Sequence, residues 1–148
     1  NDNFIELLEG PFREYANLAT QPEVKLVHDE ARSYLTRDDT RYDVLQMSLI
    51  DTWAATGAGA FTLSENGLYT VEAWRVFMDA LEDDGLFSVS RWYDPKLVSE
   101  TSRLLALATH ALIERGAVAP RDHMALVAAG KVATLANVPD MYPAAERS

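Results

Sequence analysis

The segment Tyr42–Ile50 constrains the fold more than any other part of the chain, because it is nearly continuously apolar. A strand with one solvent-exposed face alternates apolar and polar residues, whereas a parallel strand covered by helices on both faces is apolar throughout. We therefore expect this segment to be the central strand of an α/β sheet.

Segments with helical and strand-like patterns alternate along the rest of the chain. Before the central strand, we expect a helix over residues 3–19 that is interrupted near Pro11. A strand Val24–Val27 and a short helix Ala31–Leu35 should follow it. After the central strand, we expect a long loop over residues 52–67 and a helix Tyr69–Leu81, which Asp84-Gly85 ends with a left-handed cap. A strand Leu86–Trp92 and a helix from Asp94-Pro95 to Gly116 should follow.

Two final strands, His123–Ala129 and Val132–Val138, are separated only by Gly130-Lys131, which predicts an antiparallel hairpin. The order as a whole predicts an α/β fold with a mostly parallel sheet, flanking helices and this hairpin at its edge. The 148 residues suit a single domain, 1–148, with residues 140–148 as a frayed tail.

Composition excludes several classes of function. A net charge of −10 without a basic patch argues against a nucleic-acid partner. The absence of cysteine removes disulfides, thiolate metal sites and a cysteine nucleophile, and fits a reducing compartment. No apolar run approaches the ~18 residues of a membrane span. We expect a cytoplasmic chain with no membrane segment and, because its three histidines are far apart, no metal site.

Three segments resemble the spermidine synthase-like members of the S-adenosylmethionine-dependent methyltransferase superfamily. Val24–Leu35 (VKLVHDEARSYL) is similar to that family's third strand, which ends in an acidic and a small residue, Tyr42–Leu45 to the opening of the fourth strand, and Leu63–Leu86 to the next helix, turn and fifth strand. The resemblance implies a partial Rossmann-like fold with strand order 3-2-1-4-5-7-6. It also implies methyl or aminopropyl transfer, with S-adenosylmethionine or its decarboxylated form as cofactor in the intact protein.

The same resemblance implies cofactor-binding residues. Glu30 matches the family's acid that contacts the adenine amino group, Asp29 takes this place if the register shifts by one, and Ala31 is the small residue after that acid. The glycine-rich turn and the ribose-binding acid belong to strands one and two, which the match places before Asn1. We therefore expect the chain alone to bind no cofactor.

For the reaction, Ser48 matches the family's proton-accepting Asp, and Asp51 matches the second acid of that segment. A neutral serine is a poor base without an activating histidine, so aminopropyl transfer is no better supported than methyl transfer. Asp51 alternatively caps the following turn. Trp53, Glu65 and Tyr69 are the candidate substrate-binding residues. Core filling is the favoured alternative for Trp53, and helix capping is the favoured alternative for the region around Glu65.

Two classes of function are open, besides an enzyme of an unrelated class. One is a transferase fragment that is inactive alone, and the other is a non-catalytic interaction module on the same scaffold. Without strands one and two, strands three and four would stand about 14 Å apart. An open strand edge invites pairing, so we expect Val24–Val27 either to pair with the central strand or to be completed by a second copy in a homo-oligomer.

Overall fold

The computed structural model describes residues 2–49, 67–94, 96 and 100–138. They belong to two compact units, Asn1–Arg37 and Asp38–Ser148, each of which is described by itself. Within the described residues, no helix has the length and apolar character needed to cross a membrane.

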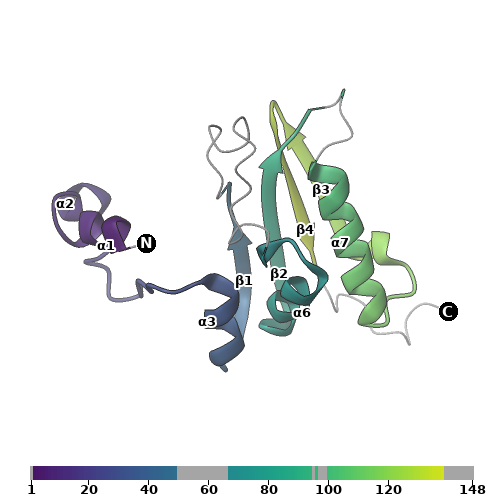
Figure 1. The fold of residues 1–148 in the computed structure, drawn as a ribbon, viewed down its shortest axis with the longest axis horizontal. Coiled ribbons are helices and arrows are strands. Elements are labelled where there is room, and N and C mark those ends of the chain that lie inside the picture. The colour runs from purple at the N-terminus through teal and green to yellow at the C-terminus, as the bar shows by residue number, and fades with distance from the viewer. Residues whose placement is uncertain (1, 50–66, 95, 97–99, 139–148) are drawn as a thin grey trace. The chain divides into compact units, whose positions relative to one another are not determined.

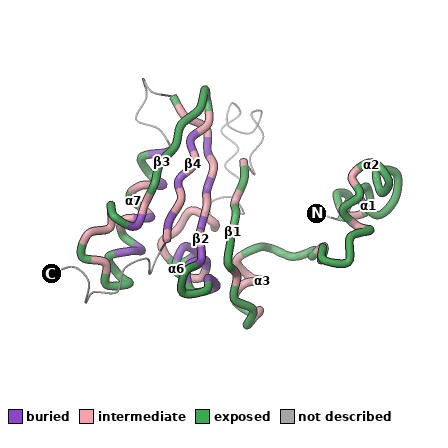
Figure 2. Tube along the Cα trace, turned by 180° about the vertical axis from the view of Figure 1, so that it is seen from behind, coloured by how far each residue is buried: buried purple, intermediate pink, exposed green. Residues whose placement is uncertain are grey.

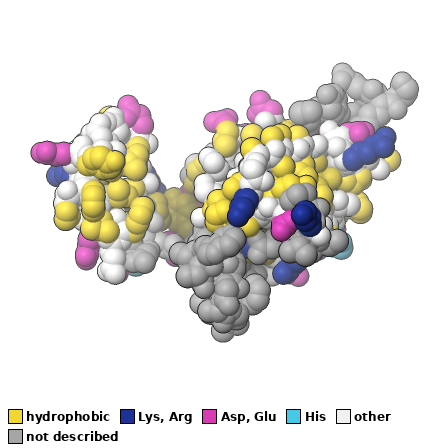
Figure 3. Space-filling view, turned by 90° about the horizontal axis from the view of Figure 1, so that it is seen from above, with side chains coloured by type: hydrophobic (Ala, Val, Ile, Leu, Met, Phe, Trp, Pro, Cys, Tyr) yellow, Lys and Arg dark blue, Asp and Glu magenta, His cyan; other side chains and the backbone are white. Residues whose placement is uncertain are grey.

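The first unit contains three short helices: α1 (Asp2–Glu9), α2 (Arg13–Ala16) and α3 (Ala31–Arg37). The predicted interruption near Pro11 is confirmed, because α1 ends at Glu9 and α2 begins at Arg13. The short helix predicted from Ala31 is also confirmed. Five large apolar side chains of this unit are exposed: Phe4, Leu7, Phe12, Tyr15 and Leu18. Figure 3 shows hydrophobic side chains on the surface of this unit.

The strand predicted at Val24–Val27 is wrong. This segment has no regular secondary structure, and the four-stranded sheet contains none of its residues. A strand exists only by hydrogen bonding to a neighbour. Here the Val24 N–H bonds back to the Gln21 carbonyl at 3.1 Å, which forms a turn. The expected pairing of this segment with the central strand is therefore also wrong for the single chain.

The second unit is built on a four-stranded sheet with the order β1-β2-β4-β3 (Figure 1). Its strands are β1 (Tyr42–Met47), β2 (Leu81–Trp92), β3 (Met124–Ala129) and β4 (Val132–Asn137). The predicted hairpin is confirmed, and Gly130 takes the left-handed conformation at its turn with φ of 59°.

The sheet is mixed, so the expectation of a mostly parallel sheet is wrong. β1 pairs with β2 in parallel, but β2 with β4 and β4 with β3 are antiparallel. The reason is that the second strand of the hairpin, rather than the first, lies beside β2. Both of its pairings are then antiparallel.

Two helices cover one face of this sheet, α6 (Val71–Asp79) and α7 (Glu100–Glu114), and a 3-10 turn η1 (Pro120–His123) precedes β3 (Figure 1). The Thr70 hydroxyl caps α6 by accepting the Ala73 N–H at 3.1 Å. The predicted end of α7 at Gly116 is confirmed, because Gly116 has φ of 91° and the Ala117 N–H returns to the Leu112 carbonyl. Whether this helix begins at Pro95 falls outside the described residues.

The predicted boundary between α6 and β2 is wrong by several residues. α6 ends at Asp79, and β2 begins at Leu81 instead of Leu86. Gly85 is therefore no helix cap but a buried strand residue. It faces β1 where the pairing register shifts between Tyr42 and Val44. A Cβ atom at Gly85 would lie 2.9 Å from the Tyr42 carbonyl oxygen, so β1 and β2 approach each other too closely there for a side chain.

The two faces of the sheet differ in burial (Figure 2). From Gly85 onward in β2 and throughout β4, the residues facing the helices are buried, Phe87, Val89 and Leu135 among them, and the alternate residues are half-buried. Trp74 and Phe77 of α6 pack against Phe87 with ring centroids 5.1 and 5.5 Å apart. This aromatic cluster is the centre of the core.

Among the strands that the structure describes, β1 has one neighbour, β2. Its burial contradicts the expectation of a strand covered on both faces. Leu45 and Met47, which face the helices, are half-buried, while Val44 on the other face is 57% exposed. The sequence of β1 is that of an inner strand, but its position is that of an edge strand.

Candidate functional site

The carboxyl ends of β1 and β2 meet at one edge of the sheet, because the two strands are parallel. Open α/β sheets bind their ligands at this edge. Of the residues predicted to act there, Ser48 follows β1 directly and is exposed. Asp51, Trp53 and Glu65 lie outside the described residues, so their predicted roles stay predictions.

Tyr69 is held at this edge by Arg91, the penultimate residue of β2. Arg91 Nη1 donates a hydrogen bond to the Tyr69 hydroxyl at 3.0 Å, and the guanidinium carbon lies 4.6 Å from the centre of the Tyr69 ring. Arg91 is only 8% exposed. The contact combines a hydrogen bond with a cation–π interaction, so it fixes the ring and places a buried positive charge near the carboxyl end of β2.

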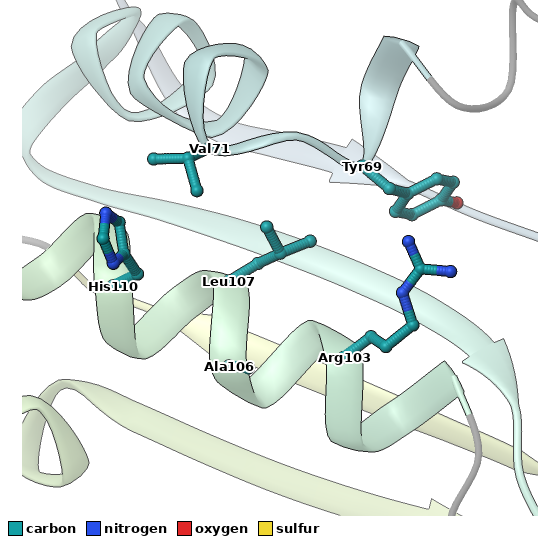
Figure 4. A pocket seen from close by; sticks show the side chains of 6 residues that line it. All are labelled: Tyr69, Val71, Arg103, Ala106, Leu107 and His110. Atoms are coloured by element: carbon teal, nitrogen blue, oxygen red, sulfur yellow. The ribbon is translucent and has the colours of Figure 1, made fainter.

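An open groove of about 330 Å³ lies between the Tyr69–Val71 segment and one side of α7 (Figure 4). The other lining residues are Arg103, Ala106, Leu107 and His110. These four recur at helical spacing and therefore share one side of α7. Arg103 and His110 lie at opposite ends of the groove, with Leu107 between them (Figure 4).

Two ion pairs join α6 to the end of α7. Arg75 Nε donates to Glu114 Oε2 at 2.7 Å, a second bond joins its Nη2 to Oε1, and Arg115 pairs with Asp79. The hydrogen bonds from Arg75 lower the pKa of Glu114, and those bonds raise the pKa of Arg75. These pairs join the middle and the end of α6 to the C-terminal end of α7, and the groove lies beside the part of α7 that precedes them.

The three predicted cofactor-binding residues lie together at the start of α3 in the first unit. The Glu30 carboxylate accepts hydrogen bonds from the N–H groups of Arg32 and Ser33, at 3.1 and 2.8 Å, and from the Ser33 hydroxyl at 2.8 Å. Asp29 accepts the Glu30 N–H and pairs with Arg37, while Ala31 is the first helical residue. In this structure Glu30 therefore caps a helix, and its contact with adenine stays a prediction.

The cap makes α3 sensitive to pH. Slight burial raises the pKa of Glu30, but the hydrogen bonds from Ser33 and Arg32 outweigh it and hold the pKa below its ordinary value of 4.5. A lowered folded-state pKa means that the stabilisation is complete above 4.5 and is lost as pH falls through the lower folded value.

We expect Glu30→Gln to destabilise α3 by about 0.5–1 kcal/mol near neutral pH, at the low end for a charged cap because the side chain is exposed. Acidification should have the same effect on the unmodified chain. Backbone NMR shifts of α3 from about pH 7 to about pH 3 provide the measurement. Glu23→Gln, which removes an exposed acid from the same unit, is the control. Equal shifts in both variants would contradict the capping role.

Sequence reasoning missed two arginines of the second unit, the buried Arg91 that contacts Tyr69 and the exposed Arg103 that lines the groove. Arg91 lies two and four residues after Val89 and Phe87, so strand alternation alone places it on the buried face. Arg103 begins a stripe with Ala106, Leu107 and His110 on α7. Both signals are present in the sequence, but neither matches a motif.

Among the described residues, no cluster of histidine, aspartate and glutamate side chains is arranged to hold a metal ion. The sequence matches no protein-family model and no curated protein. The chain is therefore placed in a class by its fold alone: a mixed α/β protein with a four-stranded sheet and helices.

Proposed function

We propose that the chain is the half of an S-adenosylmethionine-dependent transferase domain that carries strands four to seven. The observation that supports this most is the strand order. In the family the seventh strand lies between the fifth and the sixth. In this sheet the last strand, β4, likewise lies between β2 and β3, and β1 takes the place of strand four.

The state of β1 supports the same proposal. In the complete sheet strand one lies beside strand four, so strand four is an inner strand. β1 has the apolar sequence of such a strand, yet no strand of the described part of the chain pairs with its outer edge, and Val44 is 57% exposed. A strand with this composition gains stability when a neighbour buries it.

The described residues do not by themselves fit the cofactor. None of them forms a glycine-rich turn between a strand and a helix, which is the element that grips such a ligand. The Glu30 carboxylate already accepts three hydrogen bonds in the α3 cap, so its oxygens are engaged within the chain. The proposal therefore assigns methyl or aminopropyl transfer to the intact protein, with Ser48 and Asp51 at the reacting edge, and no step to this chain alone.

Calorimetry with S-adenosylmethionine and its decarboxylated form tests the proposal on two proteins: this chain and the full-length polypeptide of its gene. We expect micromolar binding of one of the two ligands by the full-length polypeptide, and no binding by this chain at millimolar concentration. Micromolar binding by the 148-residue chain would show that it is not an incomplete site. Binding by neither protein would refute the transferase assignment.

The exposed edge of β1 favours a second candidate, a non-catalytic module that pairs through this edge, in a homo-oligomer or with another chain. Sedimentation distinguishes it from the first. A module of this kind forms a stable assembly that is lost when Val44 is replaced by lysine, and it binds neither ligand at any length of the polypeptide.

A further inference from the structure

The groove beside α7 has the features of a small-molecule site. Its volume of about 330 Å³ lies at the lower end of the range of ~300–1,000 Å³ that ligand pockets occupy. Its middle is apolar, because Val71, Ala106 and Leu107 form it. An occupant of this part gains by burying apolar surface.

The charge at one end of the groove is a single exposed guanidinium. Arg103 forms no hydrogen bond or ion pair with any residue that the structure describes. The arginines at the other end differ, since Arg75 and Arg115 are paired with Glu114 and Asp79. A guanidinium binds a carboxylate or phosphate oxygen pair in preference to other groups.

The opposite end of the groove repels a carboxylate or phosphate group. His110 Nε2 lies 3.4 Å from Glu114 Oε1, so a carboxylate stands behind His110. The groove is therefore polarised, with a cation at the Arg103 end and an acid near the His110 end (Figure 4). An elongated ligand has one favoured orientation in it, with its negative group at Arg103.

We propose that this groove binds a small organic acid, whose apolar body lies on Val71, Ala106 and Leu107 and whose acid group pairs with Arg103. Tyr69, fixed by Arg91, forms the wall beside that pair. The proposal goes beyond the transferase role and does not depend on it. It shares Tyr69 with the predicted transfer site, but Arg103 supplies the charge and Val71, Ala106 and Leu107 supply the apolar floor.

NMR titration with 3-phenylpropionate tests the proposal, and 3-phenylpropylamine provides the same apolar body with the opposite charge. We expect the acid to shift the amide signals of residues 69–71 and 103–110, and the amine to leave them unchanged. Arg103→Gln should weaken binding of the acid about three- to fivefold, the effect of one exposed charge pair. Arg121→Gln, which removes an exposed arginine outside the groove, is the matched control and should bind the acid as the unmodified chain does.

Three outcomes would overturn the proposal. Equal binding of the amine would show a merely apolar surface. Equal affinity of the Arg103→Gln and Arg121→Gln variants would remove the charge recognition. Saturating concentrations of the acid with no shifts in the groove would show that there is no site. None of these results bears on binding of S-adenosylmethionine by the full-length polypeptide, so the two proposals fail separately.

Discussion

Replacing Phe87 with alanine is expected to destabilise the second unit by about 3–5 kcal/mol, at the upper end of the range for single substitutions. Phe87 is 1% exposed and contacts both Trp74 and Phe77 of α6. Truncation leaves a cavity between the sheet and the helix, and it also removes two favourable aromatic contacts.

Urea unfolding followed by tryptophan fluorescence measures this effect, because Trp74 lies in the same cluster. Val127→Ala is the control, since Val127 is 67% exposed on the outer strand β3 and its truncation should cost within ~0.5 kcal/mol. A loss of stability no greater than that of the control would mean that the aromatic cluster is not the centre of the core.

Replacing Gly85 with alanine is expected to destabilise the same unit by about 1–3 kcal/mol, the range for overpacking a closed site. The added methyl group would lie 2.9 Å from the carbonyl oxygens of Tyr42 and Glu82 and from Leu81 Cβ. Two of these three atoms belong to the backbone, so no side-chain rotation relieves the contact. The expected local result is a weaker β1–β2 pairing.

Hydrogen exchange of the β1 amides, together with urea unfolding, measures the Gly85→Ala effect. Gly67→Ala is the matched control because a Cβ there has no atom within 4 Å. Faster exchange restricted to β1 and its neighbours in the Gly85→Ala variant supports the close approach of the two strands. Unchanged stability in both variants would contradict it.

Local periodicity predicts the parts of the fold that local interactions determine. The alternation in Leu86–Trp92 and the hairpin around Gly130 both depend on neighbours in the sequence, and both are confirmed. The end of α7 at Gly116 is confirmed for the same reason, since a left-handed glycine terminates a helix whatever surrounds it.

The failures concern interactions between distant segments. Val24–Val27 has suitable residues for a strand but no partner strand within the described ranges, and propensity cannot supply one. The sequence around Gly85 favours a helix end, because glycine is common at helix ends. In the structure, position 85 requires glycine because the Tyr42 backbone of the neighbouring strand leaves no room for a side chain. The position of β4 between β2 and β3 likewise depends on which strands pair, and the periodicity of a single segment does not predict its pairing partner.

The candidate site is predictable only in part for a similar reason. Tyr69 is a predicted site residue, but its contact Arg91 lies 22 residues away, and only the packing of α6 on β2 brings them together. Arg103 belongs to no motif, and its significance comes from its place in the groove, opposite the end where Arg75 and Arg115 are paired with acids.

The apolar strand at the rim of the sheet has a practical consequence for this chain. An unprotected strand edge is a template on which further copies add to form fibrils, and β1 presents Val44 to water at such an edge. Arg41 and Asp43 lie just before Val44 in the sequence, and charged residues at a rim oppose this growth. Removing the charge of Asp43 would therefore shorten the time before the purified chain precipitates.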